Sequence, residues 1–421
     1  MVRVGVAFVG AGYWRRRLAF NLVKLIAASM LIILLALWFR KGAAVLSLAP
    51  GDSPTSKTIA SDIVPALEAI YRQRAQAVLK GDCQAVRPLF ATDSVYGKWA
   101  LEHQERRIKY LQAWSQKRGI KLTRYDVMLH VRNIEVKGET AWVFLLQTAC
   151  LGYIYNDEPS TKEKKFGIGT RHLVELVHRG GKWLVRRDWY TDPLEEDTLI
   201  PDVTPAVGRY NLPAPTGANP YPGCTLLVQI AGARAASTKS RAPAAAGQLG
   251  YNRLQAVAYA DKYCGAAWGS QNDYRYNSKY RDYTALGGDC TNFVSQVLGD
   301  KEAGGLPMDG TWCYNFSSRS PGGSRAWVQT DALADYLIYS GRATLVARGT
   351  YPEVMRRIAT LELGDLIAYQ EKGRIVHFAV VTGRDERGYV LVNSHTADRY
   401  HVPWDIGWDK KTIFWLFHIN A

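Results

Sequence analysis

The chain has 421 residues, of which 47% are hydrophobic, and its formal net charge is +15. This length gives room for more than one domain, and the hydrophobic content supports packed cores rather than an unfolded chain. The positive charge favours anionic surfaces such as phospholipid headgroups or anionic cell-wall polymers. It does not indicate nucleic acid as a partner, because no nucleic-acid-binding motif accompanies it.

The N-terminal region carries an apolar segment, residues 18–39, that is long enough to cross a bilayer, which takes about 20 residues. Arg15, Arg16 and Arg17 at the end of the basic tail 1–17 directly precede it, so the positive-inside rule places the tail in the cytoplasm and the remaining chain outside. The alternative is a cleaved signal peptide and a secreted protein. Because the apolar run is long and Pro50 spoils the best cleavage site, we predict a single-pass membrane anchor with an extracytoplasmic catalytic domain.

Residues 55–192 are predicted to form a unit of two helices and four strands. The helices are expected over 63–80 and 94–118, where Gly81 and Gly119 can end them. Four strand-like runs follow, at 121–136, 140–155, 167–179 and 182–190. This order predicts helices on one face of an antiparallel sheet. It resembles the cone-shaped fold of nuclear-transport-factor-like and cystatin-like domains, which we expect to act here as a spacer or partner-binding module.

Residues 193–249 are rich in proline, alanine, glycine, serine and threonine. This composition predicts a largely extended linker between the cone-like unit and a last domain over 250–421.

The chain holds six cysteines. An exported location permits disulfides, and the pairings Cys83 with Cys150 and Cys264 with Cys313 respect the predicted domain limits. The sequence does not fix the connectivity. It contains no Cys-x-x-Cys motif and no closely spaced histidine pair, so we predict no zinc site, and we expect no cofactor.

The stretch from Gly287 onward predicts a cysteine in the first turn of a buried helix. Gly287 and Gly288 permit a tight backbone approach, and Asp289 is a favourable N-cap residue. The unpaired amides and the positive dipole end of a helix favour the thiolate of Cys290, the form that attacks carbonyls. The alternative is a small buried cysteine that fills core space.

Two predicted strands downstream carry partners for this thiol. The first holds His377 in an apolar setting. The second, joined to it by a glycine-containing turn, holds Asn393 and His395 on one face, because they lie two residues apart. Either of these two could hold the His377 imidazole in the tautomer that accepts a proton from Cys290.

Three stretches together resemble a known family: Gly-Asp-Cys-Thr-Asn-Phe-Val-Ser-Gln at 288–296, His-Phe-Ala-Val-Val-Thr-Gly at 377–383 and Ser-His-Thr-Ala-Asp-Arg at 394–399. Over residues 250–421 the chain looks like the "putative amidase domain" of Gram-positive bacteria, within the papain-like cysteine hydrolase superfamily. The resemblance implies Cys290 as nucleophile and His377 as general base. The papain-type pattern favours Asn393 as the orienting residue and the amidase pattern favours His395; we place Asn393 first.

The predicted substrate contacts lie near the nucleophile and in aromatic loops: Asp289, Asn292, Trp312 and Trp327. The alternative for the loop tryptophans is that they cover the core of a small domain. Papain-type enzymes use a glutamine shortly before the cysteine as an oxyanion donor, and none stands at 283–289. The oxyanion hole would therefore use the Cys290 backbone N–H and a group that the sequence does not identify.

The predicted fold class is α+β: an N-terminal transmembrane helix, a cone-like helix-and-sheet domain and a papain-like hydrolase domain. The predicted function is a membrane-anchored, extracytoplasmic cysteine amidohydrolase that cleaves amide bonds, with cell-wall peptidoglycan as the expected substrate. Two alternatives stay open, a non-catalytic cell-wall or partner-binding protein and a thiol acyltransferase. The sequence makes no prediction of the oligomeric state.

Overall fold

The computed structural model describes residues 62–157, 162–192, 250–317, 319–408 and 410–420, all within one compact unit, Thr58–Ala421. The predicted membrane segment 18–39 and the predicted linker 193–249 lie outside these residues. Within the described part of the chain, no helix is long and apolar enough to cross a membrane.

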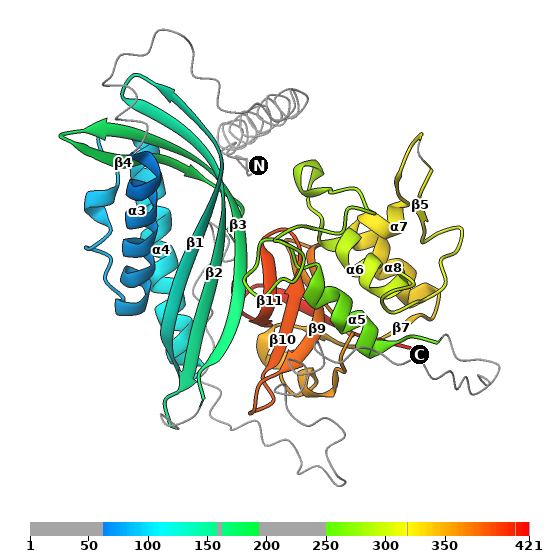
Figure 1. The fold of residues 1–421 in the computed structure, drawn as a ribbon. Helices are drawn as coiled ribbons and strands as arrows, with labels where there is room; N and C mark the ends of the chain where they lie inside the picture. The colour runs from blue at the N-terminus through cyan, green and yellow to red at the C-terminus, as the bar shows by residue number, and fades with distance from the viewer. Residues whose placement is uncertain (1–61, 158–161, 193–249, 318, 409, 421) are drawn as a thin grey trace, which may run out of the picture. The chain divides into compact units, whose positions relative to one another are not determined.

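The first part of this unit contains the predicted two helices and four strands. Its main elements are α3 (Ile63–Lys80), α4 (Val95–Lys117), β1 (Ile120–Lys137), β2 (Thr140–Tyr155), β3 (Lys164–Arg179) and β4 (Lys182–Trp189). Gly81 ends α3 in the left-handed conformation, and the Ser94 side chain caps α4 by accepting a hydrogen bond from the Gly97 N–H. Both helices lie against one face of the sheet (Figure 1). The element predictions for this part of the chain are confirmed.

The second part of this unit begins at residue 250. Along the chain, its helices come before its strands or between them. Its helices are α5 (Arg253–Lys262), α6 (Cys290–Gly299), α7 (Arg325–Val328), α8 (Thr330–Tyr339) and α9 (Tyr351–Val354). Its strands are β5 (Tyr314–Asn315), β6 (Gly322–Gly323), β7 (Ala343–Gly349), β8 (Leu366–Glu371), β9 (Arg374–Arg384), β10 (Val390–Ser394), β11 (Asp398–Pro403) and β12 (Ile413–Ile419).

The predicted fold class is wrong for the described residues, because they form a ten-stranded antiparallel sheet and a separate two-stranded one, β5 with β6, with few helices. The strand order is β1-β2-β3-β11-β10-β9-β8-β12-β7, and β4 pairs with β3. The junction is the antiparallel pairing of β3 with β11, in which Gly167 lies opposite Tyr400 and Gly169 opposite Asp398. Residues 250–420 therefore do not form the expected separate papain-like α+β domain. Their strands and those of the cone-like part belong to the same sheet. The expected transmembrane helix finds no counterpart in the described chain.

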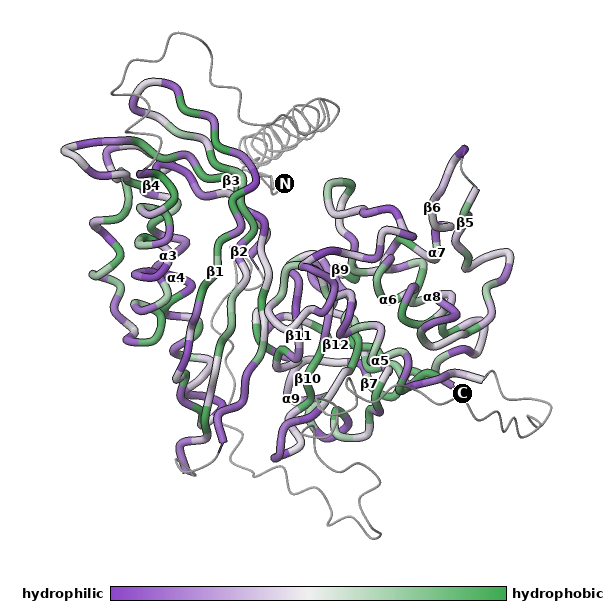
Figure 2. The backbone as a smooth tube through the Cα atoms, viewed as in Figure 1, coloured by the Kyte–Doolittle hydropathy of each residue, from purple (hydrophilic) through white to green (hydrophobic). Residues whose placement is uncertain are grey.

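The sheet has an apolar cluster on each face in the region of β8 and β9. Ile367 and Ala379 belong to the cluster that continues toward α3 and α4, whereas Ala368 and Phe378 belong to the cluster with Phe293 of α6. This alternation follows from the two-residue period of a strand. Figure 2 shows hydrophobic stretches both in the strands and in the helices that cover them. Helix α6 therefore packs on one defined face of β9.

The glycines at the β3–β11 junction allow a loop to approach the sheet closely. A Cβ atom at Gly169 would lie 2.2 Å from the Ala266 carbonyl carbon, and one at Gly167 would lie 1.9 Å from the Trp268 carbonyl oxygen. Such contacts require the backbone to move, because main-chain atoms cannot swing aside as a flexible side chain can.

We expect Gly169→Ala to lower the free energy of unfolding by about 1–3 kcal/mol, because its methyl group overlaps the backbone of the 266–268 loop. Gly310→Ala is the matched control, since a Cβ there meets nothing within 4 Å. Urea unfolding of the two variants and the wild type measures the difference. Equal midpoints for the two variants would contradict this account of the junction.

The five described cysteines are free thiols: Cys83, Cys150, Cys264, Cys290 and Cys313. The two disulfides considered from the sequence are therefore not formed in this structure. Burial raises the pKa of the Cys150 thiol to about 11, so this thiol is protonated and unreactive at neutral pH.

Candidate active site

Cys290 is the first residue of α6, as predicted. Gly287 and Gly288 before it have φ values of 112° and 121°, a conformation that glycine adopts without strain. Asp289 is the N-cap residue, but its side chain makes no capping hydrogen bond. Its carboxylate instead accepts from the Tyr283 N–H at 2.8 Å and from the Asn292 amide at 2.9 Å. The predicted position of Asp289 is confirmed, and the predicted side-chain cap is wrong.

The Cys290 thiol is buried at the edge of β9. It lies 3.8 Å from the Thr291 hydroxyl, and the backbone of Phe378 is close enough to lower the pKa of the thiol. Burial raises the pKa of this thiol, and the bonds to Phe378 and Thr291 offset only part of the rise. The resting thiol is therefore protonated, and reaction with a carbonyl requires a base.

His377 lies on β9, directly before Phe378. Its ring centroid is 5.6 Å from those of Tyr369 and Trp408, on the sheet face opposite to α6. Its Nε2 atom is buried and has no hydrogen-bond partner. Burial, followed by the charges of Arg399 and His395, holds the pKa of His377 well below its usual range. The imidazole is therefore neutral.

The structure does not join Cys290 and His377 by a hydrogen bond. Phe378, which follows His377, is the residue of β9 whose backbone lowers the pKa of the Cys290 thiol. Catalytic hydrogen bonds are often long or absent in unliganded enzymes and form when substrate binds. Cys290 lies on the α6 face of β9 and His377 on the other face, so a proton transfer between them requires the backbone of β9 to twist at His377, where β10 no longer pairs with it.

Asn393 is not placed to orient His377. It lies opposite Val380 on β9, which is on the α6 face, whereas His377 points to the other face. Its amide donates to Asp261 of α5 at 2.8 Å, and its carbonyl oxygen accepts from the Thr382 hydroxyl at 2.8 Å. These bonds tie β10 to α5 and β9. The preference for Asn393 as orienting residue does not fit this geometry.

His395 is fully buried, and both of its ring nitrogens are engaged. Nδ1 lies 2.6 Å from the Asp289 carboxylate, and Nε2 lies 2.6 Å from the Tyr263 carbonyl oxygen. A carbonyl oxygen only accepts, so Nε2 carries a proton and is not a base. His395 therefore holds Asp289, the residue before Cys290, rather than His377.

The four predicted substrate contacts point into the protein. Asp289 and Asn292 are almost fully buried, and so are both tryptophans. The Trp312 indole donates to the Ser295 hydroxyl at 3.0 Å, and the Trp327 indole donates to the Asn292 side chain at 2.9 Å. Both tryptophans thus fasten α6 to the core, as the alternative interpretation of these aromatics expected.

The structure adds Thr396 and Tyr276 to the surroundings of Cys290. The Thr396 hydroxyl accepts from the Asp289 N–H at 2.6 Å, and Thr396 itself has a φ of 56°. The Tyr276 ring stacks on His395 with centroids 3.6 Å apart. Thr396 lies within the motif at 394–399, so the sequence contained a signal from which it could have been identified as a site residue. Tyr276 lies in a tyrosine-rich loop in which no single residue stands out.

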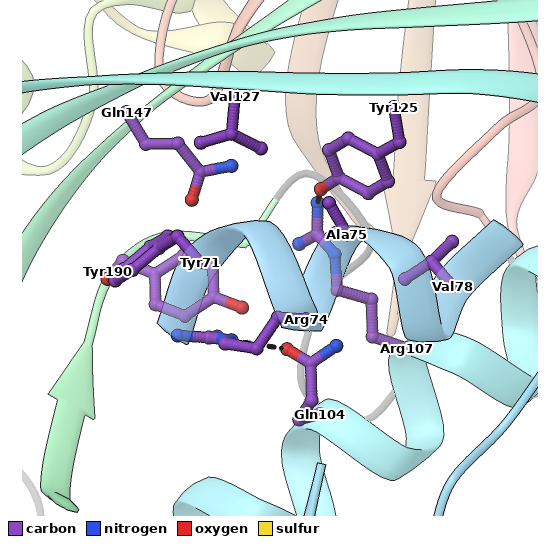
Figure 3. Close-up of a pocket in the computed structure, with 10 residues that line it drawn as sticks. All are labelled: Tyr71, Arg74, Ala75, Val78, Gln104, Arg107, Tyr125, Val127, Gln147 and Tyr190. Carbon is purple, nitrogen blue, oxygen red and sulfur yellow. Dashed lines mark hydrogen bonds between the residues drawn. The ribbon is translucent and has the colours of Figure 1, made fainter. Parts of the chain in front are cut away.

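A second buried polar cluster lies between α3, α4 and the cone-like sheet (Figure 3). Its cavity of about 20 Å³ has room for about one water molecule. Arg74 donates to Asp188 at 2.6 Å, and Arg107 donates to Asp192 at 2.5 Å. Each guanidinium is thus already paired with a carboxylate, which is the arrangement of a structural ion-pair network. Within the described residues, no group of three or more His, Cys, Asp or Glu side chains could hold a metal ion.

Residues 250–418 match a protein-family model described as "Putative amidase domain". A comparison with curated protein sequences gives no match. Among solved structures, Rv3472 of Mycobacterium tuberculosis, titled a function unknown protein, is 14% identical with a TM-score of 0.23, covering 38% of this chain and 85% of that one. A "Putative Scytalone Dehydratase" of Novosphingobium aromaticivorans is 12% identical with a TM-score of 0.23, covering 32% and 86%. TM-scores this low carry no argument about function.

Proposed function

We propose that this chain is a cysteine-dependent amidohydrolase with Cys290 as the nucleophile and His377 as the general base. The observation that carries the proposal is that neutral His377, whose buried Nε2 has no hydrogen-bond partner, directly precedes Phe378, and the backbone of Phe378 is close enough to the Cys290 thiol to lower its pKa. His395, the other predicted histidine, has both nitrogens engaged. The match to an amidase family over 250–418 supports an amide as the bond that is cleaved.

In this mechanism His377 accepts the proton of the Cys290 thiol, and the sulfur attacks the amide carbonyl carbon. The oxyanion forms beside the first turn of α6, where the backbone N–H groups have no partners within the helix. The C–N bond then breaks, and the leaving amine takes the proton from His377. A water molecule gives a proton to His377 and attacks the thioester, which releases the acid and restores the thiol.

Peptidoglycan stem peptides are the substrate class that we propose. Their amide bonds suit the chemistry, and the net charge of +15 would attract anionic cell-wall polymers. Incubation of the full chain with peptidoglycan and with released muropeptides, followed by mass analysis of the products, tests both the reaction and the substrate. A product heavier by a transferred acyl group would indicate an acyltransferase instead.

We expect His377→Ala to lower kcat by about 10²–10⁴-fold, because general-base catalysis contributes a factor of this size. His178→Ala is the matched control, since His178 on β3 packs against Trp183 in the cone-like part. In the wild type, kcat should stay constant as the pH falls through about 6.5, since the pKa of His377 lies well below the ordinary histidine value. Full activity of His377→Ala would exclude His377 as the base.

A further inference from the structure

A contact crosses from the cone-like sheet to the surroundings of Cys290. Arg171 of β3 lies 3.1 Å from a carboxylate oxygen of Asp398 on β11. Its guanidinium lies 4.8 Å from the centroid of the Tyr276 ring. The Tyr276 hydroxyl donates to the same Asp398 carboxylate at 2.5 Å, and the Ala266 N–H donates to it at 2.7 Å. Arg171 thus provides the cation for a carboxylate that is fully buried.

Tyr276 and Phe293 hold the His395 ring between them. The Tyr276 ring stacks on one side at 3.6 Å, and the Phe293 ring stacks on the other at 3.9 Å. Phe293 belongs to α6, so this stack joins the helix of the nucleophile to the loop that Arg171 contacts. Three aromatic planes in contact leave His395 little freedom to tilt.

His395 and Thr396 together fix the residue before the nucleophile. The His395 Nδ1 bonds to the Asp289 side chain at 2.6 Å, and the Thr396 hydroxyl accepts from the Asp289 backbone at 2.6 Å. A displacement of His395 would therefore move the start of α6, and with it Cys290. An unbroken series of side-chain contacts therefore joins Arg171 of the cone-like sheet to the residue before Cys290.

We propose that Arg171 is a positioning residue for the Cys290 site, so that the cone-like sheet is a functional part of the hydrolase. This inference rests on the proposed function. Asp398 is fully buried, and a buried carboxylate without its cation is strongly unfavourable. Without Arg171, only the Tyr276 hydroxyl and the Ala266 N–H would bond to it. Relaxation of Asp398 would then displace Tyr276, its stacking partner His395 and the first turn of α6.

The test uses the full chain with Arg171→Met, Arg171→Lys and the control Arg179→Met. Arg179 lies on the same strand and pairs with the exposed Asp93. In Arg171→Met, kcat should fall about 10–100-fold with KM nearly unchanged, because small misplacements of reacting groups have effects of this size. The pH midpoint of Cys290 alkylation by iodoacetamide should shift. Arg171→Lys should restore most of kcat, and Arg179→Met should match the wild type.

Tyr276→Phe keeps the ring on His395 and removes only the hydroxyl bond to Asp398, so it tests the proposal even if Arg171→Met does not fold. It should also lower kcat and shift the alkylation midpoint. Wild-type kcat and midpoint in both Tyr276→Phe and any folded Arg171→Met would overturn the inference while Cys290 remained the reactive thiol. Unchanged hydrolysis by Cys290→Ala would instead overturn the proposed function.

Discussion

Cys290→Ala should abolish hydrolysis while the protein stays folded. The substitution removes the sulfur that forms the acyl-enzyme, and removal of a nucleophile in serine hydrolases costs about a millionfold in kcat. Alanine differs from cysteine only by the sulfur atom, so the loss of stability should be small. Product masses from muropeptide digests measure activity, and circular dichroism with thermal unfolding measures the fold.

Cys313→Ala is the matched control, because Cys313 is a half-buried free thiol away from the first turn of α6. It should retain wild-type kcat. Iodoacetamide should label Cys290 before the fully buried Cys264, whose pKa burial raises well above the usual value. Wild-type activity in Cys290→Ala, or loss of activity in Cys313→Ala, would assign the chemistry to another group.

The elements that could be predicted from the sequence are those whose signals are local. Gly81 and Gly119 end helices because they adopt positive φ, and Gly138 and the pair Gly180 and Gly181 form the short turns before β2 and β4. The first turn at Cys290 was predictable for the same reason, since Gly287 and Gly288 precede it. Each of these features depends on residues within a few positions.

The features that could not be predicted depend on residues far apart in the chain. The pairing of β3 with β11 joins segments on either side of residues 193–249, and its only local sign was the pair Gly167 and Gly169 inside a strand. Asn393 lies on β10 and His395 directly after its end, but the partners of Asn393, Asp261 and Thr382, come from other elements. Hydrogen bonds of this kind decide a polar residue's role, and sequence spacing does not contain them.

The ion-pair network of the cone-like part gives the largest expected effect on stability. Asp188 accepts from Arg74 at 2.6 Å and lies 2.7 Å from the His172 Nδ1, and all three side chains are buried. Burial opposes ionisation of Asp188, but His172 and the Arg74 guanidinium outweigh it and hold the pKa of this carboxyl well below its usual range. Asp188→Asn removes the negative charge and leaves the Arg74 cation buried without a counter-ion.

We therefore expect Asp188→Asn to lower the free energy of unfolding by about 3–5 kcal/mol at pH 7, as breaking one side of a buried pair does. Because the folded-state pKa of Asp188 is depressed, its contribution is complete above the unfolded-state value of about 3.9 and is lost as the pH falls toward the folded-state value. Urea unfolding from pH 7 to pH 3 should show that the difference in free energy of unfolding between wild type and variant becomes smaller below about pH 4.

The control is Asp93→Asn, which breaks only the exposed pair with Arg179 and should unfold like the wild type at every pH. A variant as stable as the wild type at pH 7 would show that the Arg74–Asp188 pair does not hold the helices to the sheet.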